Sequence, residues 1–139
     1  MARRLPSLCN STTLEIMKDV SIDFDGTLEY KEVQDYVQTL MDRPDVRVWI
    51  TTRRYPNKPG RMNHDLYKVA KKLGIPNERI TFCNFLYKFE VISDRNFVFH
   101  LDDDPMDLEL LAKGSKGKIK CVQYLVDGNW RGHCERFLK

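Results

Sequence analysis

Residues 20–28 of this chain have the sequence VSIDFDGTL. The apolar residues at the start of the stretch predict a short strand over residues 20–23, and Gly26 then permits a sharp turn. Asp23 and Asp25 lie two positions apart where this strand ends, a spacing that lets both carboxylates face one pocket. The stretch therefore predicts a buried strand that carries two acids at its carboxyl end.

Helical and strand patterns alternate through the rest of the chain. Apolar residues at helical spacing predict a helix from about residue 31 and a second one that begins after Asn63 and stops at Gly74. Further strands are expected over residues 46–50, 80–83, 96–101 and 119–125, and a short helix over residues 106–111. This order favours a single-domain α/β fold, a Rossmann-like three-layer sandwich with a mainly parallel sheet and functional residues at the carboxyl ends of its strands.

Length and composition suit one compact domain. The chain has 139 residues, and we expect an N-terminal extension over residues 1–18 and the folded domain over residues 19–139. Hydrophobic residues make up 42% and charged residues 31%, which argues against a disordered or fibrous protein. No apolar run is long enough to cross a bilayer, and no secretory signal is recognisable, so we expect a cytoplasmic protein with no membrane partner. The purpose of residues after 125 stays open.

The four cysteines and the net charge narrow the function classes. Cys9, Cys83, Cys121 and Cys134 are widely scattered, without the short paired spacings of zinc sites or disulfide frameworks, and we expect free thiols. A net charge of +3 is too small to predict nucleic-acid binding by itself. Four basic residues nevertheless cluster in one expected loop, and we give them equal weight as a solvated loop and as a phosphate-binding segment: Arg53, Arg54, Lys58 and Arg61.

The acidic residues suggest phosphoryl chemistry. A carboxylate such as Asp23 can attack phosphorus, while a second one such as Asp25 protonates the leaving oxygen and then activates water. Because carboxylates and phosphate repel each other, such a site needs a divalent cation, and Mg2+ prefers oxygen ligands. More acids follow the strand expected at residues 96–101, namely Asp102, Asp103, Asp104 and Asp107. Asp104 is expected only to cap the next helix.

Two further residues fit the same chemistry. Thr51, at the end of the strand over residues 46–50, can hydrogen-bond a transferring phosphoryl group, and Lys88 can neutralise charge on nucleophile and phosphate. His100 lies inside a strand, where a histidine is more often packed or hydrogen-bonded than catalytic. Trp130 is expected to pack in the core rather than to stack on a base.

In this order the motifs resemble the haloacid dehalogenase-like (HAD) hydrolase superfamily, whose members are mostly phosphatases on a Rossmann-like sheet. The resemblance spans roughly residues 19–112. It implies Asp23 as nucleophile and Asp25 as general acid/base, with the Asp25 backbone carbonyl as a metal ligand. It further implies Thr51 as the phosphate-binding hydroxyl, with Thr52 as the alternative, and Lys88 as the basic residue, with Lys71 or Lys72 as the alternatives. Asp102, Asp103 and Asp107 resemble its acidic motif, and which of them binds Mg2+ directly is open.

The short gaps between these motifs leave no room for a cap domain. The resemblance therefore implies an open site, which either admits a large substrate or is covered by a second subunit of a homo-oligomer.

We thus expect a magnesium-dependent phosphomonoester hydrolase that acts through an aspartyl-phosphate. Thr52, Arg53 and Arg54 are expected to bind substrate, either a small molecule such as a nucleotide or a phosphorylated nucleic-acid end. Two alternatives remain: a binding or assembly module of the same fold without turnover, and a phosphotransferase that passes the group to an acceptor other than water.

Overall fold

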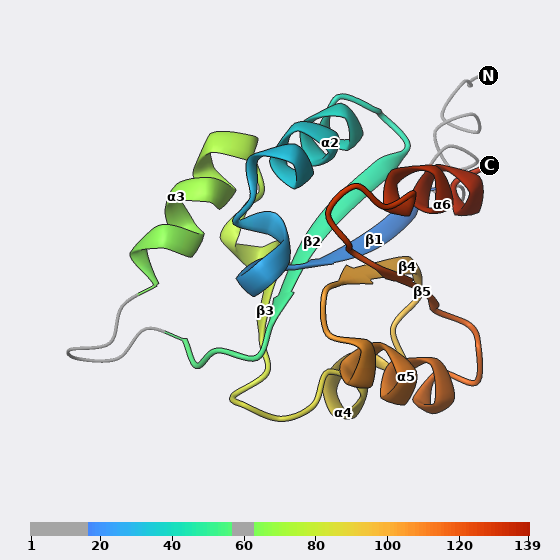
Figure 1. Ribbon diagram of the computed structural model, residues 1–139. Coiled ribbons are helices and arrows are strands. Elements are labelled where there is room, and N and C mark those ends of the chain that lie inside the picture. Colours follow the sequence, from blue (N-terminus) through green and yellow to red (C-terminus); the bar gives the residue numbers. More distant parts are fainter. Residues whose placement is uncertain (1–16, 57–62) are drawn as a thin grey trace, which may run out of the picture.

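The computed structural model describes residues 17–56 and 63–139 and contains a five-stranded, all-parallel sheet of order β3-β2-β1-β4-β5 (Figure 1). The strands are β1 (Lys18–Asp23), β2 (Val46–Thr52), β3 (Ile80–Phe82), β4 (Phe97–Asp102) and β5 (Lys120–Gln123). The helices are α2 (Lys31–Met41), α3 (His64–Leu73), α4 (Phe89–Ile92), α5 (Pro105–Gly114) and α6 (Trp130–Phe137), with short helical turns η1 (Phe24–Leu28) and η2 (Asn77–Arg79). The α/β, Rossmann-like prediction is confirmed.

Helices cover both faces of the sheet. Helices α2, α3 and α6 lie over one face, and α4 and α5 lie over the other (Figure 1). The apolar stripes of α2 and α3 pack on Val20, Ile22, Val48 and Ile50, which are fully buried and form the larger core. β1 is the central strand of the sheet. Asp23 at its end and Asp25 just beyond it therefore lie at the middle of the side of the sheet where the strands have their carboxyl ends.

A bulge in β4 changes which face its side chains occupy. Asp19 of β1 pairs with Phe97, whereas Ser21, two residues on, pairs with His100, three residues on. The additional residue places Phe97 in the smaller core with Ile92, Leu111 and Ile119, while Phe99 joins the larger core. His100 and Asp102 consequently share the face of Ser21 and Asp23.

Local signals explain most element ends. Gly74 adopts a left-handed conformation (φ 85°) and closes α3. The Asp104 side chain accepts hydrogen bonds from the backbone N–H groups of Met106 and Asp107 and begins α5, as predicted. Asn63 is the N-cap residue of α3, but its side chain makes no capping bond and donates to the Tyr55 carbonyl instead.

Several boundaries differ from those predicted. β2 continues to Thr52, because both Thr51 and Thr52 pair with β3, and β5 is shorter than the 119–125 segment. Two helices lie in segments for which the sequence predicted no element, the short α4 and, near the C-terminus, α6. Trp130 of α6 is buried and makes edge contacts with the rings of Tyr36 and Tyr124, which confirms the packing role. The division at residue 18 stays a prediction, since residues 1–16 lie outside the described part. Over residues 17–56 and 63–139, no helix combines the length and apolar character needed to span a membrane.

Candidate active site

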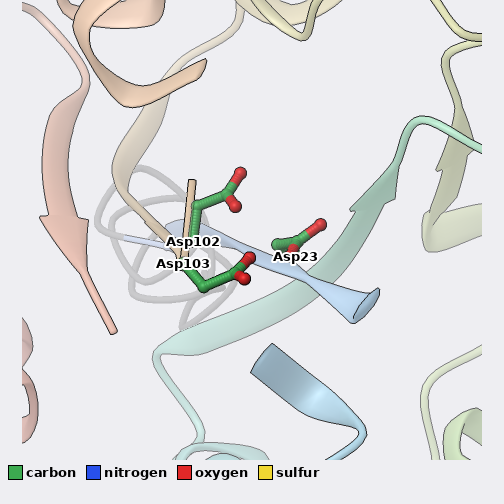
Figure 2. Close-up of side chains that lie close together, drawn as sticks. All are labelled: Asp23, Asp102 and Asp103. Carbon is green, nitrogen blue, oxygen red and sulfur yellow. The ribbon is translucent and has the colours of Figure 1, made fainter. Parts of the chain in front are cut away.

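Three acids meet at the carboxyl ends of the two central strands. Asp23 is the last residue of β1, Asp102 is the last residue of β4, and Asp103 follows it. Each offers one carboxylate oxygen, and these oxygens lie within 4.8 Å of one another. Figure 2 shows the three side chains close together. The bulge in β4 contributes directly to this meeting, because it turns Asp102 to the face that Asp23 occupies.

Lys88 joins two of these acids from the start of α4. Its ammonium group donates to Asp23 Oδ1 at 2.7 Å and to Asp102 Oδ2 at 2.6 Å. All three residues are almost completely buried. Neither Lys71 nor Lys72 takes this place: both belong to α3, and Lys72 donates to Gln34.

Asp107, in the first turn of α5, supports the lysine. Its Oδ1 accepts from the Lys88 backbone N–H at 3.2 Å, and its Oδ2 lies 3.6 Å from the Lys88 ammonium. That Oδ2 atom is buried and has no hydrogen-bond partner among the described residues. The Lys88 charge compensates this buried oxygen, and a water at this place could supply the missing hydrogen bond.

The charges in this cluster shift one another's pKa values. Burial raises the pKa of Asp23 well above its usual value, against the opposing effect of Lys88. Burial alone would lower the pKa of Lys88, but the carboxylates of Asp23 and Asp102 raise it. Burial would raise the pKa of Asp102, but hydrogen bonds from His100 and Lys88 hold it below the usual range. Burial and the charge of Asp102 raise the pKa of Asp103. The lysine is thus held charged among acids that repel one another.

Gly26 makes room for Asp103. Its φ of 79° favours glycine, and a Cβ at this position would lie 2.3 Å from Asp103 Oδ2. Thr27, one residue on, donates to Asp23 Oδ2 at 3.1 Å and lies 3.5 Å from Asp103 Oδ1. The Gly26-Thr27 turn after β1 therefore orients both carboxylates.

Asp25 lies at the rim of the cluster with its side chain half exposed. Its carboxylate accepts two hydrogen bonds from Arg54, at 2.6 and 3.0 Å, and the same guanidinium donates to Asp65 at 2.8 and 2.9 Å. Arg54 thus holds the predicted acid/base through a two-pronged ion pair.

The two threonines at the end of β2 are both buried and turn their hydroxyls in different directions. Thr51 lies beside Asp23 in the strand register, but its hydroxyl forms a 2.7 Å hydrogen bond with Ser21. Thr52 accepts from the Arg54 backbone N–H at 3.2 Å. A role of either hydroxyl towards phosphate stays a prediction.

Ser21 and His100 complete a polar chain beneath the acids. Ser21 Oγ is 2.7 Å from His100 Nδ1, and His100 Nε2 is 2.8 Å from Asp102 Oδ2. His100 is therefore hydrogen-bonded, as predicted. No role was predicted for Ser21, although a serine within an apolar strand, two positions before an acid, is a signal that could have identified it.

A cavity of about 440 Å3 opens above these residues. It is lined by Asp23, Asp25, Arg53, Lys88, Asp102, Asp103, Asp104, Pro105 and Asp107. The predicted residues Thr51, Thr52 and Arg54 lie beside this cavity without lining it, as far as the described residues show. Lys58 and Arg61 lie outside the described residues.

The residues present suit a magnesium ion. Mg2+ binds through one or two carboxylates and retains waters and substrate oxygens, and the cluster of Asp23, Asp102 and Asp103 offers ligands of that kind. The Oδ2 atom of Asp107 is no independent sign of a metal, because the Lys88 ammonium lies 3.6 Å away and already supplies a cation. The Asp25 side chain is turned to Arg54, so its contribution as a ligand rests on the predicted backbone carbonyl.

Comparison with known proteins does not assign the chain to a family. No protein-family model matches the chain, and no curated protein shows significant similarity to it. The resemblance to the HAD-like hydrolases thus rests on the motifs and stays a hypothesis.

Proposed function

We propose that this protein is a magnesium-dependent phosphomonoester hydrolase of the HAD-like type that acts through an aspartyl-phosphate. The observation that carries the proposal is the cluster of Asp23, Asp102 and Asp103 in the lining of one cavity, with the Lys88 ammonium bound to the first two. A nucleophile, a fixed positive charge and a group of oxygen ligands are the parts that phosphoryl transfer to a carboxylate needs.

In the proposed reaction an Asp23 oxygen attacks phosphorus and the bond from phosphorus to the ester oxygen breaks. Asp25 gives a proton to that oxygen, and the alcohol departs. Asp25 then takes a proton from water as the water attacks the aspartyl-phosphate, which releases inorganic phosphate and restores Asp23. In the structure both Asp25 oxygens accept from Arg54 at the cavity rim, so Asp25 must turn away from Arg54 for either proton transfer.

The other residues hold the reacting groups in place. Lys88, fixed by Asp102 and Asp107, keeps a positive charge next to Asp23 as negative charge approaches. Asp23, Asp102 and Asp103 would hold Mg2+, with Asp107 and the Asp25 carbonyl as further predicted ligands. When bound, the ion supplies charge neutralisation for the phosphoryl oxygens.

Substrate, assembly and location form part of the same proposal. Arg53 lines the cavity and favours an anionic substrate such as a nucleotide or a phosphorylated nucleic-acid end. A second subunit that covers the cavity stays a prediction of the capless pattern. Free Cys83, Cys121 and Cys134 suit a reducing compartment, which supports a cytoplasmic location.

The test is release of inorganic phosphate from an aryl phosphate with Mg2+ and with a chelator. We expect turnover that requires the metal and falls by at least about a thousandfold in Asp23→Asn, because the variant lacks the nucleophile. Asp35→Asn, which removes an exposed acid paired with Lys31 on α2, is the matched control and should retain the wild-type rate.

Two other outcomes would assign the alternatives. A folded wild-type protein that binds Mg2+ but hydrolyses nothing would favour the binding module. Transfer of the phosphoryl group to an added alcohol in preference to water would favour the phosphotransferase.

A further inference from the structure

The loop between β3 and α4 exposes three apolar side chains beside the cavity. Phe85, Leu86 and Tyr87 are 55%, 48% and 38% exposed, respectively. The loop runs from buried Cys83 to buried Lys88, so its exposed part lies directly before the lysine that contacts Asp23. Its apolar side chains therefore border the proposed phosphate site.

The loop backbone is held in an unfavourable conformation. Asn84 and Phe85 have φ values of 54° and 66°, and a phenylalanine in the left-handed region is a true outlier. Three backbone N–H groups donate to the last residue of β2 and to the segment after it and so fix the loop: Cys83 to Thr52, Asn84 to Arg54 and Phe85 to Arg53. Strain of this kind persists where the surrounding structure imposes it and is concentrated at ligand sites.

Arg53 connects this loop to the cavity. It lines the cavity together with Asp23 and Lys88. Its guanidinium donates to the carbonyls of Phe85 and Leu86 at 2.8 and 3.2 Å and lies 4.8 Å from the centre of the Tyr87 ring. Arg53 thus links the cavity to the backbone of Phe85 and Leu86 and to the Tyr87 ring.

We infer that the Phe85 ring is a stacking surface for the base of a nucleotide whose phosphate enters the cavity, with Arg53 beside the sugar-phosphate. The inference rests on the proposed function and specifies its substrate class. Tyr87 contacts Arg53 and stacks on Phe89. Phe85 makes an edge contact with the Tyr55 ring at 4.8 Å between ring centres, yet it is more exposed than Tyr87. Aromatic side chains bind bases of any sequence by stacking.

The arrangement favours a nucleotide over an aryl or phosphotyrosine ester. Phe85 borders the cavity but does not line it, so the bound ring must be separated from phosphorus by a spacer. In an aryl phosphate the ring is attached to the phosphate oxygen directly, whereas in a nucleotide the pentose separates the two. Free nucleoside monophosphates and 5′-phosphorylated oligonucleotides both have a pentose between the base and the phosphate.

The test measures binding rather than turnover. Asp23→Asn protein with Mg2+ is titrated calorimetrically with adenosine 5′-monophosphate and with ribose 5-phosphate, which lacks only the base. We expect the nucleotide to bind about fivefold to a hundredfold more tightly. Phe85→Ala in the same background should remove most of this preference. Leu125→Ala, which truncates an exposed apolar residue on the segment before α6, should retain it.

A second variant controls for the possibility that Phe85→Ala loses the preference through misfolding. Phe85→Leu keeps apolar bulk and loses the ring, and it should also lose the preference. Equal affinities for the two ligands in the parent protein, or a preference that survives in both Phe85 variants, would overturn the inference, as would tighter binding of a phosphotyrosine peptide than of the nucleotide. The affinity for a 5′-phosphorylated hexanucleotide, measured as a third ligand, shows whether the site prefers a free nucleoside monophosphate or the phosphorylated end of a nucleic acid.

The two proposals fail in different ways. A base preference without phosphate release from any ester would leave the nucleotide site standing and remove the hydrolase. Hydrolysis of an aryl phosphate without a base preference would remove only the nucleotide site.

Discussion

The Lys88 ammonium lies 2.7 Å from Asp23 Oδ1, and both residues are at least 96% buried. The β4 acid Asp102 takes a second hydrogen bond from the same nitrogen. A buried ion pair of this kind adds little net stability, but loss of one partner leaves an uncompensated charge in the interior. The lysine is therefore a structural element of the site as well as a candidate catalytic one.

The Lys88→Met variant should lose about 3 to 5 kcal/mol of unfolding free energy in the absence of metal, because Asp23 and Asp102 would face each other without a cation. Urea denaturation measures the loss. Lys113→Met removes an exposed lysine paired with Glu109 and should change stability by less than about 1 kcal/mol. Similar losses in both variants would contradict the assigned burial.

Gly26→Ala should disrupt magnesium binding, because its Cβ would overlap Asp103 Oδ2. Gly74→Ala is the matched control: Gly74 has a similar φ of 85°, but its nearest neighbour would be Met41 Cε at 3.8 Å. Both variants should lose about 1 kcal/mol or more of stability from the left-handed backbone. Only Gly26→Ala should weaken Mg2+ binding in calorimetric titration. Equal affinity in the two would remove Asp103 from the metal site.

Ser21→Ala and Thr51→Val test whether the Thr51 hydroxyl only stabilises the fold or also binds the phosphoryl group. Both variants break the 2.7 Å hydrogen bond between Ser21 and Thr51, and Ser21→Ala also breaks the 2.7 Å bond between Ser21 and His100, so each should cost about 1 to 3 kcal/mol of stability, with Ser21→Ala the costlier. If Thr51 turns to the phosphoryl group in the reaction, Thr51→Val should also lower kcat by about tenfold or more, well beyond the effect of Ser21→Ala. Equal kcat values in the two variants would assign Thr51 a packing role only.

The Arg54 guanidinium lowers the pKa of Asp65 to about 2 from the usual 3.8. A lowered folded-state pKa means that the carboxylate stabilises the fold above the usual value and that this contribution disappears as pH falls towards 2. Because the Asp65 side chain is 61% exposed, we expect Asp65→Asn to cost only about 0.2 to 1 kcal/mol at neutral pH. Urea denaturation should show a smaller cost at about pH 3. A cost that grows in acid would contradict the ion pair.

The sequence predicted the features that depend on local pattern. Residues 20–28 contain a strand, a glycine turn and both acids within nine positions, so the end of β1 could be placed directly. The capping role of Asp104 at the start of α5 could likewise be predicted, since capping depends on neighbours two and three residues away.

Features that depend on tertiary contacts were not predicted. The contacts of Arg54 with Asp25 and Asp65 join residues that are 29 and 11 positions apart, respectively, and no pattern within one segment specifies them. Helix α6 was missed because its buried side is short, with Trp130 and Cys134 as its buried residues. The polar chain through Ser21 and His100 requires the register between β1 and β4, which the alternation of residues 97–101 does not reveal.

The bulge in β4 has a consequence for the mutations that this strand can tolerate. Deletion of one residue between Phe97 and His100 would change no catalytic residue, yet it would restore simple alternation with β1. Because Phe97 and His100 already face the side of the smaller core, the shortened strand would keep both side chains, and Asp102 beyond them, on their present faces. The acid cluster thus depends on which face Asp102 occupies rather than on the bulge itself, and deletion of Val98 should be less damaging than loss of Asp102.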